Sequence, residues 1–302
     1  MSWRISVDHE TQYLYKENIG SQHNEVRMAP RDTQSQFTIE HNISIEPASN
    51  ISRYKDYFGT RVASFTIPGI HNSLTINSHS LVETAQGAAH HARAPITWGA
   101  LQSDPILDKF CEYLSFTNYV DSSEQYDWLI DKLKQFEKPG MAVEFLTNWI
   151  RENVSYIPGS SDISTTASTT MINRSGVCQD FVHLSLAILR TLGIPCRYVS
   201  GYLYPKDSEE IGEMVIGESH AWVQVWLGDW YGVDPTNDID EANIQVNIDK
   251  DGNRLTNSGS RIIGELPFTG SNGSTLVFLS AILIVAGLIL NRKKRQKRTQ
   301  EI

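Results

Sequence analysis

The sequence predicts an α+β fold that has an all-β region first, then helices, then strands again, and a single transmembrane helix near the C-terminal end. Three observations support this prediction. Apolar and polar residues alternate with a period of two in residues 1–85, where β-branched residues are frequent. Apolar residues recur at helical spacing between residues 105 and 192, and alternation returns from residue 196. An uncharged apolar run follows close to the C-terminus.

Residues 1–85 predict a small β-sandwich. Turn signals such as NIGSQHN, KDYFGT and PGIHNS separate the alternating stretches, so four or more strands with one apolar face are expected. The five histidines of this region lie on polar strand faces or in turns and form no catalytic constellation: His9, His23, His41, His71 and His79. Residues 86–104 are interpreted as a linker.

Residues 105–248 predict a second domain, rich in helices at first. Residues 139–159 carry apolar side chains at helical spacing. A further helix begins at Cys178 and stops at Gly193, before Pro195. The remainder of this domain predicts strands, among them a hairpin that turns at Gly228.

The composition is that of a globular protein with an acidic body. Hydrophobic residues make up 40% and charged residues 20% of the chain, which allows a sizeable core. The last twelve residues hold six basic residues and one acidic residue, a net charge of +5. Because the whole chain has a net charge of −9, the preceding residues have a net charge of −14. An acidic body argues against a nucleic-acid partner, because such partners need a basic face.

The three cysteines predict neither a disulfide scaffold nor a zinc ribbon, because they cannot all pair and show no CxxC spacing. Cys111 and Cys196 are interpreted as buried structural residues. A zinc site built from Cys178, His183, Cys196 and His220 matches no zinc-ligand spacing. No metal and no cofactor is therefore expected.

Cys178 is the candidate nucleophile. It lies in the first turn of its predicted helix, where unpaired backbone N–H groups and the helix dipole favour a negative group. The thiolate is the nucleophilic form of cysteine. Gly176, which has no side chain, is expected to let a substrate carbonyl approach. On this feature alone, a buried structural cysteine remains an alternative.

His220 and Asp234 are the candidate base and its orienting acid. His220 starts one strand of the predicted hairpin, and Asp234 ends the other strand just before Pro235. An aspartate in this position can accept a hydrogen bond from one imidazole nitrogen, which leaves the other nitrogen for the thiol. Cys178, His220 and Asp234 together therefore predict a catalytic triad.

The segments SGVCQDFVHLSLAILRTLGIPCRYVSGYL and SHAWVQVWLGDWYGVDPTN resemble the core of the transglutaminase-like superfamily, which has a papain-like cysteine fold. The stretch QYLYKENIGSQHNEVRMAPRDTQSQ resembles the β domain that precedes this core in bacterial members. The resemblance covers residues 3–240 and assigns the family's catalytic roles to Cys178, His220 and Asp234. Weak oxyanion candidates are Asn173 and Gln179, while His183 is expected to pack in the helix.

The resemblance implies acyl transfer at an amide bond through a thioester, with a protein or peptide as substrate. Hydrolysis would make the protein a peptidase or amidase, and this is the favoured interpretation. Attack by a lysine amine would make it a cross-linking transglutaminase. A wall-anchored binding or adhesion module that keeps the fold without the chemistry is the alternative from another class, and the complete triad argues against it.

The C-terminal residues 266–302 resemble the cell-wall sorting signal of Gram-positive surface proteins. They contain the pentapeptide LPFTG, an apolar run within residues 274–290, and a basic tail, in that order, after a polar linker at 249–265. The resemblance implies that a sortase cuts between Thr269 and Gly270 and joins the threonine to peptidoglycan. It also implies contact with the membrane through the C-terminal helix.

The N-terminal sequence MSWRISVDHETQYLYKENIG alternates polar and apolar residues and predicts a β-strand instead of an export signal. The basic tail is expected to remain on the cytoplasmic side of a membrane, which places the body outside. Surface attachment is therefore the preferred prediction, and a cytoplasmic location is the alternative.

Overall fold

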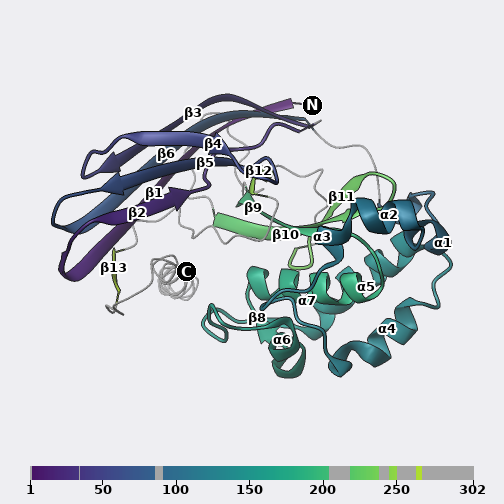
Figure 1. Cartoon of the computed structure of the whole chain (residues 1–302). Coiled ribbons are helices and arrows are strands. Elements are labelled where there is room, and N and C mark those ends of the chain that lie inside the picture. Colours follow the sequence, from purple (N-terminus) through teal and green to yellow (C-terminus); the bar gives the residue numbers. More distant parts are fainter. Residues whose placement is uncertain are drawn as a thin grey trace, which may run out of the picture. The chain divides into compact units, whose positions relative to one another are not determined.

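The computed structural model describes residues 2–33, 35–85, 91–203, 218–237, 245–249 and 263–266. Two compact units are present, one formed mainly by residues 4–83 and the other mainly by residues 84–201 and 220–252 (Figure 1).

The predicted sorting signal lies outside the described residues, except for Leu266, and so do Thr269, Gly270 and the transmembrane run. Among the residues that the structure describes, no helix has the length and apolar character needed to cross a membrane.

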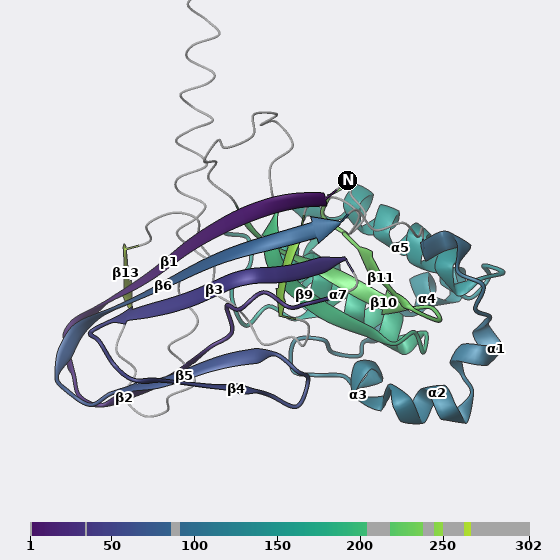
Figure 2. The same cartoon turned by 90° about the horizontal axis from the view of Figure 1, so that it is seen from above.

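The first unit is a β-sandwich, as the alternation of residues 1–85 predicts. Its strands are β1 (Ser2–Ile19), β2 (Gln22–Val26), β3 (Gln36–Glu46), β4 (Ile51–Lys55), β5 (Arg61–Ile67), β6 (His71–Ala85) and β13 (Ile263–Leu266). One sheet has the order β13-β1-β6-β3 and the other has the order β2-β5-β4. Figure 2 shows β1, β6 and β3 side by side, with β2, β5 and β4 as the second layer.

Apolar residues from both sheets fill the space between the two layers. Phe65 and Ile67 of β5 belong to the same buried cluster as Leu74 and Ile76 of β6. Side chains on a strand point alternately to the two faces, so Ser64 lies on the face of β5 opposite to Phe65. The polar residues that alternate with these apolar residues therefore remain at the surface.

The second unit combines helices with a four-stranded sheet. Its helical segments are η1 (His91–Arg93), α1 (Trp98–Leu101), α2 (Asp104–Lys109), α3 (Cys111–Leu114), η2 (Glu124–Tyr126), α4 (Asp127–Leu133), α5 (Pro139–Asn153), α6 (Ala167–Asn173) and α7 (Cys178–Thr191). Its strands are β7 (Ser155–Tyr156), β8 (Ser175–Gly176), β9 (Cys196–Leu203), β10 (Glu218–Trp226), β11 (Trp230–Val233) and β12 (Gln245–Asp249). The large sheet has the order β11-β10-β9-β12, and β7 pairs with β8.

Helix α7 forms the centre of this unit. Its apolar residues from Phe181 to Leu189 are buried in one cluster with Val223 and Val225 of β10. The helix ends where predicted: Gly193 has a φ of 74°, and the Ile194 N–H donates to the Leu189 carbonyl over 3.0 Å. Burial on nearly all sides explains the long apolar run of this segment.

The helical spacing that begins at residue 105 corresponds first to two short helices, α2 and α3, which are separated at Phe110. Phe110 is 5% exposed, and its ring centroid lies 4.5 Å from that of Trp226. Because Phe110 turns inward, the neighbouring Cys111 is exposed, so the prediction of a buried Cys111 is wrong. The prediction for Cys196 is confirmed: it is fully buried, and burial raises the pKa of its thiol to about 11.

Much of the predicted linker 86–104 is folded. Leu101 is completely buried, and the Trp98 indole Nε1–H donates to the Phe136 carbonyl over 2.8 Å. Residues from His91 onward are therefore an integral part of the helical unit, while residues 86–90 lie outside the described chain. Because the apolar residues of this stretch are few and irregularly spaced, no periodic signal marks them.

Gly140 provides a test of this packing. A Cβ atom at Gly140 would lie 2.4 Å from the carbonyl oxygen of His91 and 3.1 Å from Cα of Ala92. Because both are backbone atoms, we expect Gly140→Ala to destabilise the unit by about 1–3 kcal/mol. Gly99→Ala is the matched control, because nothing lies within 4 Å of its added Cβ and alanine favours helix. Urea unfolding followed by circular dichroism measures both, and equal midpoints would contradict the expectation.

Candidate active site

The β10–β11 hairpin brings His220 and Asp234 together. The two strands pair from Val223 with Val233 to Trp226 with Trp230, around a turn in which Gly228 has a φ of 97°. Asp234 follows the last paired residue of β11, so its side chain reaches the first half of β10. The His220 Nε2 atom lies 2.7 Å from Asp234 Oδ2, and both side chains are buried.

Asp234 is surrounded by donors on both carboxylate oxygens. Oδ1 accepts from the backbone N–H groups of Thr236 (2.8 Å) and Asn237 (3.1 Å). Oδ2 accepts from His220 and also from the Asn237 side-chain amide over 3.2 Å. These hydrogen bonds offset the cost of burying the carboxylate beside the imidazole.

Three further residues support this pair, and sequence reasoning did not assign them a role. The Asn237 amide lies 3.3 Å from His220 Nε2 as well, and the Asn237 carbonyl accepts from Arg151 of α5 over 3.0 Å. The fully buried Trp222 stacks on the imidazole, with ring centroids 6.1 Å apart and planes 19° apart. Asn237 belongs to the DPTN motif, and only the fold shows which atoms it contacts.

Cys178 lies at the first position of α7, half-buried, and its side chain is close enough to His220 to raise the pKa of the imidazole. Asp234 occupies Nε2 of His220, so Nδ1 is the ring nitrogen that remains for the thiol. The structure therefore brings together all three predicted triad residues within the second unit. The arrangement has a nucleophile, a base and a group that orients the base.

The electrostatics of the site favour a protonated His220. Burial lowers the pKa of this imidazole, but hydrogen bonds to Asp234 and Cys178 and the negative charges of both raise it to about 10. A ring with this pKa carries its second proton at neutral pH. It can therefore balance the charge of a thiolate at Cys178 and donate a proton to a leaving group.

Asp180 determines where α7 begins. Its Oδ2 atom accepts from the Val177 backbone N–H over 2.7 Å and from the Ser161 hydroxyl over 2.5 Å, and the residue is 1% exposed. A Cβ atom at Gly176 would lie 2.6 Å from the Asp180 Cβ. The space beside Gly176, which the sequence suggested for a substrate carbonyl, is thus occupied by Asp180.

The two weak oxyanion candidates differ in their positions. Asn173 is the exposed last residue of α6, and in the described part of the chain no hydrogen bond joins its side chain to the triad. Gln179 follows the nucleophile in α7. Its backbone N–H and that of Cys178 have no acceptor among the described residues, as is usual in a first helical turn.

His183 packs inside the unit, as the sequence suggested. Its ring stacks on Tyr119 with centroids 5.7 Å apart and planes 11° apart, and it is tilted against Tyr198. Across the described segments, no group of three or more His, Cys, Asp or Glu side chains could hold a metal ion. The fully buried Cys196 thiol donates to the Leu186 carbonyl.

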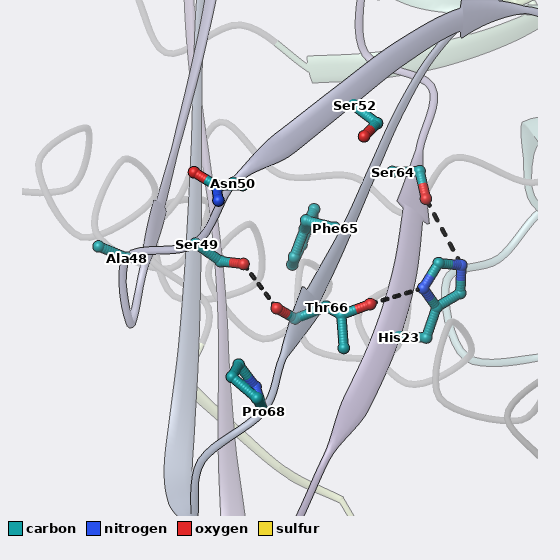
Figure 3. A pocket seen from close by; sticks show the side chains of 9 residues that line it. All are labelled: His23, Ala48, Ser49, Asn50, Ser52, Ser64, Phe65, Thr66 and Pro68. Carbon is teal, nitrogen blue, oxygen red and sulfur yellow. Dashed lines mark hydrogen bonds between the residues drawn. The ribbon is translucent and has the colours of Figure 1, made fainter.

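A cavity of about 650 Å³ lies in the β-sandwich unit and contains none of the triad residues (Figure 3). His23 lies there between two hydroxyl groups, with Nδ1 3.0 Å from Thr66 Oγ1 and Nε2 3.5 Å from Ser64 Oγ. No carboxylate lines the cavity, so nothing in it would stabilise an imidazolium as Asp234 does. The triad is therefore the better candidate for catalysis.

The sequence matches two family models, and their extents correspond to the two regions of the chain. The transglutaminase-like superfamily matches residues 129–235, which include the three triad residues, and the bacterial transglutaminase-like N-terminal region matches residues 5–83. The chain belongs to the transglutaminase-like superfamily.

The chain is also similar to proteins of two mycobacteria and of Pseudomonas aeruginosa. An uncharacterized protein of Mycobacterium leprae is 39% identical over 251 residues, which cover 82% of this chain and 89% of that protein. An uncharacterized protein of Mycobacterium tuberculosis is 29% identical over 269 residues, covering 82% and 84%. A protein-glutamine gamma-glutamyltransferase of Pseudomonas aeruginosa is 30% identical over 81 residues, which cover 26% of this chain and 12% of that protein.

Among solved structures, a candidate cysteine protease from Cytophaga hutchinsonii is similar with a TM-score of 0.66 and 21% sequence identity. The match covers 83% of each chain. This similarity supports the fold, which combines an all-β region with a transglutaminase-like core.

Asp234→Asn tests the electrostatic role of the carboxylate. The amide keeps one oxygen for the Thr236 and Asn237 N–H groups but removes the charge beside His220. We expect the rate at which iodoacetamide modifies Cys178 at pH 7 to fall by about tenfold or more, towards the rate of an ordinary thiol. Asp121→Asn is the matched control, because Asp121 accepts from Ser168 and Tyr126 away from the triad. An equal loss in both variants would assign Asp234 a purely structural role.

The titration of His220 gives a prediction on pH. We expect its imidazole to stay protonated at pH 7 and to titrate near pH 10, whereas His9 and His41, whose pKa values burial lowers to about 4, are neutral. The folded pKa exceeds the ordinary value of 6.5, so protonation of His220 stabilises the fold fully below pH 6.5. This contribution is lost as the pH rises towards 10.

Heteronuclear NMR of the imidazole carbons measures these titrations directly. In Cys178→Ala the pKa of His220 should fall, because both the hydrogen bond and the charge of Cys178 raise it. A neutral His220 at pH 7 in the unmodified protein would contradict this account of the site.

Proposed function

We propose that the protein catalyses acyl transfer at amide bonds of a protein or peptide through a thioester on Cys178, and that water is the acceptor. The observation that supports this proposal is the contact of His220 with both Cys178 and Asp234 inside one folded unit. A binding module would not need a buried, charged acid beside a histidine, because burying such a group is costly.

In the first half of the reaction, Sγ of Cys178 attacks the carbonyl carbon of the substrate amide while His220 holds the thiol proton. The tetrahedral intermediate carries a negative oxygen. His220 then gives its proton to the amide nitrogen, the C–N bond breaks, and the amine leaves. The product is a thioester between the acyl group and Cys178.

The first turn of α7 is suited to stabilise the negative oxygen of that intermediate. The backbone N–H groups of Cys178 and Gln179 point out of the helix start without an acceptor in the described structure. Preorganised donors of this kind contribute several kcal/mol in related chemistry, about 3–4 for a single donor.

In the second half, His220 changes its role. Acylation removes the negative charge and the hydrogen bond of the Cys178 thiolate, two of the influences that raise the pKa of His220. The imidazole therefore becomes neutral more readily and can take a proton from the incoming water. Water attacks the thioester carbon, the C–S bond breaks, and the proton returns to the Cys178–His220 pair.

Two similar proteins suggest the two possible acceptors, water and an amine. The candidate cysteine protease resembles this chain along 83% of its length and supports hydrolysis. The gamma-glutamyltransferase, which transfers acyl groups, matches over 26% of this chain and supports an amine acceptor as the second candidate. The longer similarity is our reason for favouring water.

The decisive experiment compares the reactivity of Cys178 with that of Cys111. We expect iodoacetamide at pH 7 to modify Cys178 at least about tenfold faster than the exposed Cys111, because only Cys178 contacts a protonated histidine. Incubation with a peptide library should give an acyl-enzyme in the unmodified protein and in Cys111→Ala, but not in Cys178→Ala. Mass spectrometry identifies the acyl group and shows whether water or a lysine amine removes it.

Two outcomes would overturn the proposal. Equal modification rates at Cys178 and Cys111 would show that the Cys178 thiol is not activated. Full amidase activity in Cys178→Ala would show that the reaction needs no thioester on Cys178. Release of the acyl group to lysine instead of water would keep the mechanism and replace hydrolysis with cross-linking.

A further inference from the structure

Tyr156 lies beside the start of α7, although it is 22 residues away from Cys178 in the sequence. Strands β7 and β8 pair in parallel, with Tyr156 directly opposite Gly176. The Ile157 backbone N–H also donates to the Gly176 carbonyl over 3.0 Å. This pairing places β7 next to the segment that leads into Cys178.

Two observations show that the side chain of Tyr156 is directed towards the first turn of α7. The side chains of opposite residues in a strand pair point to the same face, and a Cβ on Gly176 would meet Asp180 in that first turn. The Tyr156 ring also contacts the edge of Phe181, with centroids 6.2 Å apart and planes 78° apart. Residues three apart on a helix share a face, so Phe181 lies on the same side as Cys178.

The Tyr156 ring is only partly covered by these contacts. Tyr156 is 51% exposed and the following Ile157 is 48% exposed. Single exposed apolar residues are common and need no explanation. Here, the half-exposed ring of Tyr156 faces the helical turn that carries a half-buried thiol, whereas the side chain of Ile157 points to the opposite face of the extended segment. The segments 155–161 and 175–179 contain no charged residue, and the following Asp180 is only 1% exposed. An apolar, uncharged surface therefore borders the nucleophile.

We propose that the ring of Tyr156 forms an apolar wall of the substrate site and receives an aromatic or aliphatic side chain next to the reactive amide. The inference rests on the proposed function, because it assigns the wall to the substrate that acylates Cys178. Such a wall favours peptides with an apolar residue beside the amide. It disfavours peptides with a charged residue there, because the wall offers no partner for a charged side chain. Tyr156 is a specificity residue and takes no part in the proton transfers.

The test uses reagents that report on the surroundings of each thiol without turnover. Iodoacetamide, N-benzyl iodoacetamide and N-(2-aminoethyl) iodoacetamide react with the full chain, and mass spectrometry gives the rates at Cys178 and at the exposed Cys111. At each thiol, the rate with N-benzyl iodoacetamide is divided by the rate with plain iodoacetamide. This ratio should be about tenfold higher at Cys178 than at Cys111, because the benzyl group and the wall would shield roughly 50 Å² of apolar surface from water.

Variants then assign the preference to the wall. Tyr156→Ala should reduce the ratio to the value at Cys111 while it leaves the rate with plain iodoacetamide within about twofold. Tyr156→Phe should keep the ratio, because the ring remains. Trp128→Ala is the matched control, since Trp128 is 50% exposed and also contacts one other aromatic ring, that of Trp149, by its edge. Tyr156→Leu should give an intermediate ratio and remains informative if Tyr156→Ala fails to fold. Ile157→Ala should leave the ratio unchanged, because its side chain points to the opposite face of the strand.

The outcomes separate this inference from the proposed function. A fast reaction of Cys178 without benzyl preference, a preference that survives Tyr156→Ala, or a faster reaction with the aminoethyl reagent would overturn the apolar wall alone. A Cys178 that reacts with plain iodoacetamide no faster than Cys111 would overturn the proposed function first.

Discussion

The carboxylate of Asp180 determines the position of the first turn of α7, and the geometry of the site depends on that turn. By accepting from the Val177 N–H and the Ser161 hydroxyl, it joins the loop before α6 to the start of the helix. It lies against Gly176, where any larger residue would collide with it. Cys178 is one residue beyond Val177, so a shift of this cap would move the nucleophile away from His220. A displacement of about 1 Å can already reduce a rate by about 10²-fold.

The other half of the site is held by sheet hydrogen bonds. The register of the β10–β11 hairpin places Asp234 beside His220, and the Thr236 and Asn237 N–H groups orient the carboxylate. Arg151 connects this segment to α5 through the Asn237 carbonyl. Helix and hairpin are therefore two rigid supports, and the contact between Cys178 and His220 forms where they meet. Such support preserves a productive geometry at little cost at the moment of reaction.

Much of this arrangement could be predicted from the sequence, because long periodic segments carry strong signals. The 14-residue α7, its stop at Gly193 and the hairpin around Gly228 follow from apolar spacing and turn residues. The two-residue strands β7 and β8 are too short for any period, so Tyr156 gave no signal of its position. Cys111 was misplaced because Phe110 interrupts the helix, a tertiary contact that helical spacing does not contain.

The burial of Cys196 has a consequence for the redox chemistry of the protein. All three thiols are unpaired, and Cys196 is sealed in the core with a pKa of about 11. A thiol that stays protonated at neutral pH is a poor attacking group, so Cys196 cannot resolve a sulfenic acid formed on Cys178 by peroxide. The core of the unit therefore offers no thiol that could reactivate an oxidised Cys178, and a thiol from outside that core would have to reach it.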